Sequence, residues 1–190
     1  MKKTEIIKIK KIDSLRDISY NQFLQFNELV ALAEQLEEDK DSFLTYKILK
    51  LFYELPKETV KKFTLEQTEE LLSKALSIFN DSPTLQNIVI MEGKEYGLIP
   101  NFGKITSGEL IDLEDLFKND KWIEIFSILY RPIVGEINDR GEYRIEEYEE
   151  YDDRFKNIDA YTAIACKNFF FKSFQILKQH TLTSTETPKK

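Results

Sequence analysis

The chain of 190 residues has few of the side chains that bind metals or form disulfides. Cys166 is its one cysteine and His180 its one histidine. A single cysteine cannot close an intramolecular disulfide, and two such residues are too few for a usual zinc site with four ligands. The sequence also lacks any run of about 18 apolar residues, and no apolar stretch follows the basic N-terminus as in a signal peptide. We therefore expect no metal, no cofactor and no membrane segment, in a protein of the cytoplasm.

Cys166 and His180 are also unsuited to act as a catalytic pair. A cysteine nucleophile needs a basic neighbour within hydrogen-bond reach. Both residues fall on one predicted helix, where their separation corresponds to about 21 Å of rise. We interpret Cys166 as a small core residue and His180 as a residue near the end of that helix.

Acidic and aromatic side chains are plentiful by contrast. The net charge is -7 at pH 7, the sequence pI is about 5.0, and aromatic residues make up 13% of the chain. Affinity for phosphates depends on clustered Lys and Arg, so we expect no nucleic-acid partner. The basic exception is the opening MKKTEIIKIKK, which we interpret as a strand with solvated lysines in preference to a phosphate-binding arm.

The hydrophobic share of 42% excludes a generally disordered chain, and a chain of this length can bury roughly 70% of its unfolded surface. The apolar periodicity predicts an α+β fold that is predominantly helical. We expect residues 1–180 to form a single domain, with a helical part over 1–80, a hairpin-and-helix part over 84–180, and a disordered tail over 181–190. The predicted elements are a strand at 5–12, helices at 20–37, 42–54, 56–62, 65–79, 106–117, 122–130 and 159–180, and hairpins at 87–99 and 133–146.

Three helix starts carry capping-box spacing, in which a hydroxyl residue is followed three positions later by Glu or Gln. These pairs are Ser19 with Gln22, Thr64 with Gln67, and Thr106 with Glu109. Pro132 predicts the end of the helix before it, because proline lacks an amide hydrogen and disfavours helical geometry in the preceding residue. That preceding residue is Arg131, which we expect to bond the last helix carbonyls or a carboxylate of the acidic segment 142–153; contact with a partner is the alternative.

Two further patterns could indicate chemistry. The glycines match neither G-x-G-x-x-G nor G-x-x-x-x-G-K-[ST], so they predict turns and caps and no nucleotide site. The carboxylates of the helix at 106–117 include Asp112 and Asp115 on one face, as an acid-base or metal pair would require. Because leucine and isoleucine alternate with them, we interpret Glu109, Asp112, Glu114 and Asp115 as a solvated face of an amphipathic helix.

The candidate partner-binding residues lie near the C-terminal end. In the acidic segment, tyrosines alternate with carboxylates, which can form a binding rim because tyrosine offers contact area at low entropic cost. A solvated connector is the alternative. Three consecutive phenylalanines at 169–171 cannot all face one core, so at least one should face another element or chain. The candidate binding set is Tyr143, Tyr148, Tyr151, Glu149, Glu150, Phe170 and Phe171.

Five short segments together resemble a group of proteins encoded among the virion-assembly genes of tailed bacteriophages, including crAss-like phages of Bacteroidota. The segments are DISYNQF at 17–23, YGLIPN at 96–101, ITSGELIDLE at 105–114, ILYRPI at 128–133 and YRIEEY at 143–148. The resemblance covers most of the chain up to about residue 178, and none of these motifs is a catalytic signature.

The resemblance implies a noncatalytic virion-assembly protein of the host cytoplasm, similar to the tail-assembly chaperones that bind a tail component and keep its apolar surface from aggregating. A structural protein of the neck, tail or internal cargo, located in the virion, is the alternative. We expect a phage tail or other virion protein as partner, with self-association as a further option. An enzyme acting on nucleic acid or nucleotides is the third reading.

Overall fold

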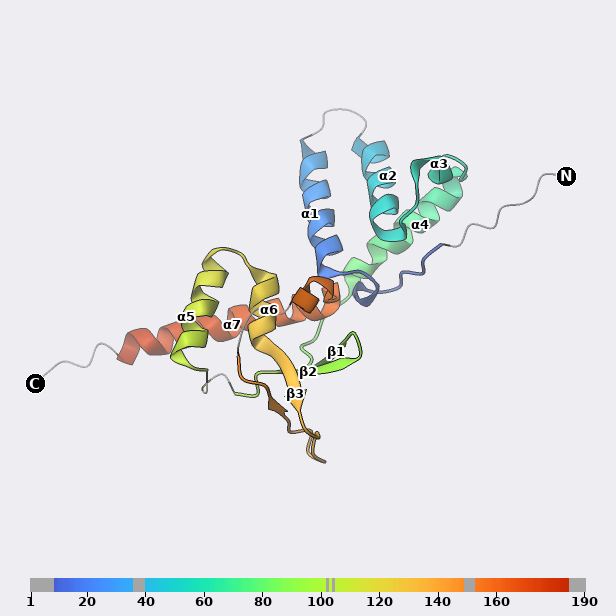
Figure 1. Cartoon of the computed structure of the whole chain (residues 1–190). Coiled ribbons are helices and arrows are strands. Elements are labelled where there is room, and N and C mark those ends of the chain that lie inside the picture. The colour runs from blue at the N-terminus through green and yellow to red at the C-terminus, as the bar shows by residue number, and fades with distance from the viewer. Residues whose placement is uncertain (1–8, 36–39, 102, 104, 149–152, 185–190) are drawn as a thin grey trace, which may run out of the picture. The chain divides into compact units, whose positions relative to one another are not determined.

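The computed structural model describes residues 9–35, 40–101, 103, 105–148 and 153–184, with side chains described to residue 173 (Figure 1). Over these ranges it contains seven α-helices and one four-stranded antiparallel sheet, which confirms the predominantly helical α+β fold. The chain divides into two compact units, residues 1–82 with 159–161 and residues 83–158 with 162–190. Each unit is described by itself, and the single domain expected over 1–180 stays a prediction.

Unit 1 is helical, as predicted. After a 3₁₀ turn at Leu15–Asp17 it contains four helices and a second 3₁₀ turn, at Ile78–Asn80. Part of the strand expected at 5–12 is wrong, since residues 9–12 are not in a strand; the other part lies outside the described residues. Pro56 precedes its short helix as the N-cap and is not the first helical residue. The helices are α1 Tyr20–Glu34, α2 Lys40–Tyr53, α3 Lys57–Val60 and α4 Leu65–Ser77.

The core of unit 1 is aromatic where α1, α2 and the 3₁₀ turn after α4 meet. The ring of Phe26 lies 4.4 Å from that of Phe79 and 5.6 Å from that of Phe52, measured between centroids. Such offset and tilted ring pairs add to the burial of apolar surface. Gln22 donates from its amide to the carbonyl of Leu51 at 2.8 Å, which joins α1 to α2. The helices therefore pack through both rings and a defined polar contact.

All three predicted capping boxes are confirmed. In each pair the hydroxyl of the Ser or Thr accepts a hydrogen bond from the backbone N–H of the Gln or Glu three positions later. The side chain of that Gln or Glu accepts from the backbone N–H of the Ser or Thr. A fourth, unpredicted box joins Ser14 to Asp17 at the first 3₁₀ turn. Because these bonds are local in sequence, the spacing alone locates the helix starts.

Unit 2 holds the sheet and three helices. The strands run in the order β1 Ile88–Met91, β2 Lys94–Leu98, β3 Tyr130–Val134 and β4 Arg144–Ile145, each antiparallel to its neighbour. The first predicted hairpin is confirmed, and its loop residues Glu92 and Gly93 have φ of 51° and 78°, as a type I′ turn requires. The helices are α5 Ser107–Lys118, α6 Trp122–Leu129 and α7 Ala160–Ser184, with a 3₁₀ turn at Asp153–Asn157.

The second hairpin differs from the prediction of 133–137 paired with 142–146. Strand β3 begins at Tyr130, directly after α6, and pairs with β4 only through Ile133 with Ile145 and Val134 with Arg144. Pro132 thus ends the helix but lies inside a strand. Its carbonyl accepts from Glu146 at 2.9 Å, so its missing N–H falls at the end of the β3–β4 ladder, where little pairing is lost. Helix α7 continues to Ser184, beyond the expected end at 180; residues 185–190 lie outside the described chain.

Candidate functional site

An ion pair joins the sheet to the start of α5. Nη1 of Arg131, on β3, lies 2.9 Å from Oε1 of Glu109, and their side chains are 12% and 7% exposed. The other carboxylate oxygen of Glu109 accepts from the backbone of Thr106 at 2.7 Å, closing the capping box. One carboxylate thus caps a helix and neutralises a buried guanidinium, which are both structural roles.

This arrangement corrects two predictions. Arg131 pairs with Glu109, and no ion pair joins it to those carboxylates of the acidic segment that the structure describes. Glu109 is 6% exposed and so does not belong to the solvated face, because it points back to the cap and to β3. Asp112 and Asp115 are exposed, as the prediction had them, and Glu114 is partly exposed.

Tyr143 is held against the sheet. Its hydroxyl lies 2.9 Å from the carbonyl oxygens of both Asn87 and Leu98, to which it can donate. Its ring covers Gly97 so closely that a Cβ at that position would lie 2.2 Å from Cε2 of the tyrosine. Burial raises the pKa of the phenol. Tyr143, which was predicted to lie at a binding rim, therefore also stabilises the first hairpin through hydrogen bonds to its backbone.

The other predicted rim residues are placed unevenly. Tyr148 is partly exposed, and its neighbours Glu149, Glu150 and Tyr151 lie outside the described residues. Their part in binding stays a prediction.

The consecutive phenylalanines of α7 separate into buried and exposed members. Phe170 is 1% exposed, with its ring 5.8 Å from that of Phe117 and 6.0 Å from that of Trp122, so the prediction that it faces a partner is wrong. Phe171 is 38% exposed and rests on the same two rings, at 5.2 and 5.3 Å. We call Phe117, Trp122, Phe170 and Phe171, where α5, α6 and α7 meet, the aromatic cluster.

Lys167 completes this surface. Its Nζ lies 4.4 Å from the centre of the Trp122 ring, in cation–π geometry. Burial lowers the pKa of this lysine, and the negative charge of Asp120 acts in the opposite direction. Asp120 also accepts from the indole N–H of Trp122. The cluster is thus a largely buried group of aromatic rings from which Phe171 is exposed, and aromatic side chains are enriched at protein-binding surfaces. Sequence reasoning identified Phe171 but missed Lys167 and Trp122, which reach the cluster through tertiary packing.

Two cavities offer further sites, one in each unit. In unit 2 a cavity of about 430 Å³ is lined by Ile99, Pro100, Ile105, Ile145 and other residues, among them Arg131 and Tyr143. Nε of Arg131 is buried without an acceptor among the described residues. The lining thus combines apolar side chains with the charged Arg131 and Arg144, and the buried Nε does not itself offer a donor to a bound molecule.

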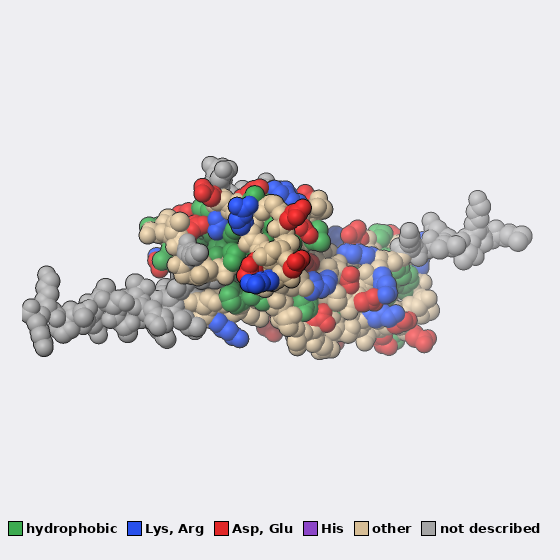
Figure 2. Space-filling model, turned by 90° about the horizontal axis from the view of Figure 1, so that it is seen from below, with side chains coloured by type: hydrophobic (Ala, Val, Ile, Leu, Met, Phe, Trp, Pro, Cys, Tyr) green, Lys and Arg blue, Asp and Glu red, His purple; other side chains and the backbone are tan. Residues whose placement is uncertain are grey.

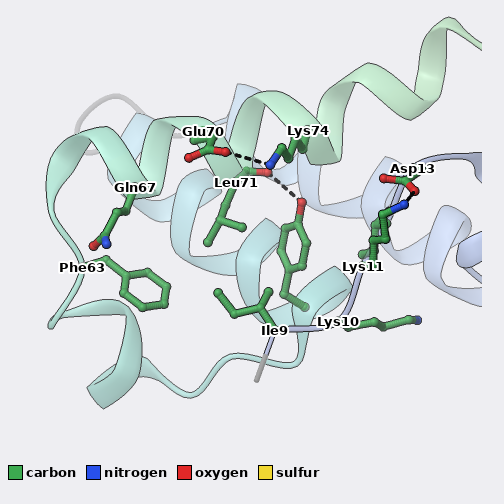
Figure 3. Close-up of a pocket in the computed structure, with 11 residues that line it drawn as sticks. Ile9, Lys10, Lys11, Asp13, Phe63, Gln67, Glu70, Leu71 and Lys74 are labelled. Carbon is green, nitrogen blue, oxygen red and sulfur yellow. Dashed lines mark hydrogen bonds and ion pairs between the residues drawn. The ribbon is translucent and has the colours of Figure 1, made fainter. Parts of the chain in front are cut away.

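In unit 1 a cavity of about 410 Å³ lies between the segment 9–13 and α4 (Figure 3). Leu71 extends from α4 toward Ile9, with Phe63 beside them, and Tyr53 donates to the carbonyl of Leu71 at 2.9 Å. Four of the charged residues that line it are paired, Lys74 with Glu70 and Lys11 with Asp13. Lys10 also lines the cavity, which therefore combines an apolar interior with a basic residue at its rim.

The buried position of Cys166 does not favour nucleophilic chemistry. Cys166 is fully buried, and burial raises the pKa of its thiol, which opposes the nucleophilic thiolate form. The side chain of His180 lies outside the described set. Where side chains are described, there is no group of three or more His, Cys, Asp or Glu placed to hold a metal ion. Within the same part of the chain, none of the helices combines the length and apolarity needed to cross a membrane.

On the face drawn in Figure 2, acidic and basic side chains are interspersed, with hydrophobic side chains visible between them. No protein-family model, curated protein or solved structure matches the chain. The residues themselves are thus the basis for assigning a function.

Proposed function

We propose that this protein is a noncatalytic virion-assembly protein of a tailed phage, acting as a tail-assembly chaperone. The observation that carries the proposal is the aromatic cluster, in which Phe171 is 38% exposed while the neighbouring Phe170 is buried. The five phage-like segments described above support the assignment to virion assembly.

The aromatic cluster suits the binding of an apolar segment. Phe171 is supported by two rings whose positions are set by packing, so little conformational entropy is lost when a partner covers it. Aromatic anchors of this kind, surrounded by polar groups, account for much of the affinity of protein interfaces. A chaperone that covers the apolar surface of a tail component needs such an anchor.

Co-expression tests the proposal. We expect a candidate tail protein from the same phage to be more soluble when it is produced with this protein, and the gain to be lost with Phe171→Ser. Ile111→Ser is the matched control, because Ile111 is also exposed, at 66%, and lies on the outer side of α5. Equal loss with both variants, or none with either, would contradict the role of the cluster.

Mass spectrometry of purified virions separates the chaperone from a structural component. A chaperone should be absent from particles, whereas stoichiometric presence would replace this proposal with a neck, tail or cargo role. A pull-down from infected cells identifies the partner in either case.

The enzyme alternative is tested at the exposed carboxylates of α5. Replacing Asp112 and Asp115 by Asn should leave assembly function unchanged, because their carboxylates are on the solvated side of the helix. Loss of phage production with intact folding would favour an enzyme instead.

A further inference from the structure

The outer edge of β1 presents unpaired backbone groups. The strand is at the edge of the sheet (Figure 1), and the carbonyl of Asn87 accepts from Leu98 on β2 at 2.7 Å. Backbone groups of successive strand residues point to alternate sides. Asn87, Val89 and Met91 therefore face β2, whereas the N–H and C=O groups of Ile88 and Ile90 face outward.

This edge lacks the features that usually protect one. Residues 87–91, NIVIM, contain no charged residue and no proline, although lysines and prolines commonly block edge strands. The side chain of Ile90 is 70% exposed. In a chain with a net charge of -7, this neutral apolar strip is the part of the sheet best suited to pair with another strand.

We propose that β1 pairs antiparallel with β1 of a second copy about a two-fold axis through Val89, joining two four-stranded sheets into one continuous sheet. In this register Ile88 faces Ile90 of the second copy, and Ile90 faces its Ile88. The N–H and C=O groups of Ile88 and Ile90 all point to the outer side of the strand. In this register each of these four groups has a hydrogen-bond partner on the second copy. Val89 faces its own counterpart.

Side chains and charges agree with this register. Met91 falls opposite Asn87 of the second copy, and Glu92 opposite its Gln86, so no like charges meet. Ile88 is the register partner of Gly97, over which the ring of Tyr143 lies. The pairing thus brings Ile88, Ile90 and Tyr143 of both copies together on one face of the joined sheet. The inference uses residues outside the aromatic cluster and does not depend on the proposed function.

A proline substitution tests the edge without breaking the hairpin. Ile90→Pro removes an N–H that points outward, whereas Val89→Pro would remove one that pairs with β2. We expect light scattering after size exclusion to give twice the chain mass of 22.5 kDa for the native protein over a dilution series, and 22.5 kDa for Ile90→Pro. Ile90→Lys should act in the same way through charge, and Ile111→Lys, at another exposed isoleucine, should stay dimeric.

Circular dichroism confirms that each variant is folded, and Ile90→Lys retains the edge test should the proline unfold the hairpin. A native protein that is monomeric throughout the series would overturn the proposal. So would a dimer that survives both Ile90 substitutions, which would point to another surface.

Cysteine exchange tests the register. Facing residues of a hydrogen-bonded antiparallel pair have Cα atoms about 5.5 Å apart, within reach of a disulfide. A mixture of Ile88→Cys and Ile90→Cys proteins should therefore cross-link on mild oxidation. Either protein alone should not cross-link, because the introduced cysteines of its two copies would be offset by two residues. Their Cα atoms would then lie more than about 8 Å apart. A cross-link in a sample of one variant alone would contradict this pairing. So would the absence of any cross-link in the mixture.

Discussion

Arg131 and Glu109 form a buried ion pair, 2.9 Å between Nη1 and Oε1, that connects the central part of the sheet to the first turn of α5. The helices α1 and α4 use glutamine at the same capping position, as Gln22 and Gln67. Among the described contacts, these glutamines bond backbone and cap groups and no arginine, for which a neutral side chain is sufficient. Glutamate at position 109 is explained by the second bond, which its carboxylate makes to β3.

Glu109→Gln should separate these two roles. The amide oxygen can still cap α5, but the charge of Arg131 is left without a counter-ion in a poorly solvated position. Removing one partner of a buried pair typically costs about 3–5 kcal/mol, and since Arg131 keeps slight exposure we expect a value near the lower end. Chemical denaturation measures the change in the free energy of unfolding.

Asp112→Asn is the control for this prediction. It makes the same chemical change on the exposed side of α5 and should stay within about 0.5 kcal/mol of the native protein. Equal effects of the two substitutions would show that the ion pair contributes no more than a surface charge does.

Local features of this fold could be read from the sequence, and the reason is physical. The capping pairs, the hairpin at 88–98 and the end of α6 depend on residues within a few positions of each other, where hydrogen-bond reach and backbone dihedral preferences act directly. Pro132 shows the limit. It was expected to end a helix, which it does, but its place inside β3 depends on β2 and β4, strands remote in sequence.

The candidate site was harder to predict because it depends on tertiary packing. Phe170 and Phe171 are adjacent and chemically identical, yet one is buried and the other exposed, since helix geometry turns neighbours by about 100°. Both rings contact Trp122 and Phe117, which come from helices remote in sequence. No local pattern around 170 could specify those contacts, nor the choice of Glu109 as partner for Arg131.

Gly97→Ala should displace Tyr143 from the sheet. The added Cβ would lie 2.2 Å from Cε2 and 2.6 Å from Cδ2 of the ring, so the ring must move and its hydroxyl must leave the carbonyls of Asn87 and Leu98. We expect a loss of about 1–3 kcal/mol of stability, as for other overpacked sites. In a Tyr143→Ala background the same substitution should cost less, which a double-mutant cycle measures.

Gly108→Ala provides the comparison for that experiment. A Cβ there would meet only Oγ1 of Thr106, at 4.0 Å, and alanine is the better helix former. Stability should be unchanged or slightly raised. A similar loss at both glycines would argue against a specific clash with Tyr143.

Tyr143 should also make stability depend on alkaline pH. Burial raises the pKa of its phenol, so the folded state favours the neutral form. The contribution of this group is complete below the unfolded value of about 10 and is lost as the pH rises through the folded pKa. In Tyr143→Phe this part of the decline should vanish. Tyr53, whose pKa burial also raises, should continue to titrate late in tyrosinate absorbance.

Cys166 should report the opening of unit 2. Its thiol is fully buried and burial raises its pKa, so an aromatic disulfide reagent should react only when the surrounding structure opens. The rate should be far below that of Ile111→Cys, whose introduced thiol is at a 66% exposed position outside the proposed pairing edge. Phe170 lies one helical turn from Cys166 on the same face, and Phe170→Ala should cost about 3–5 kcal/mol through the cavity it leaves. If opening and closing are fast compared with modification, this loss should accelerate modification of Cys166 by a factor of about 100 or more, since each 1.4 kcal/mol is tenfold. Rapid modification of the native thiol, at the rate of the denatured chain, would contradict the buried position.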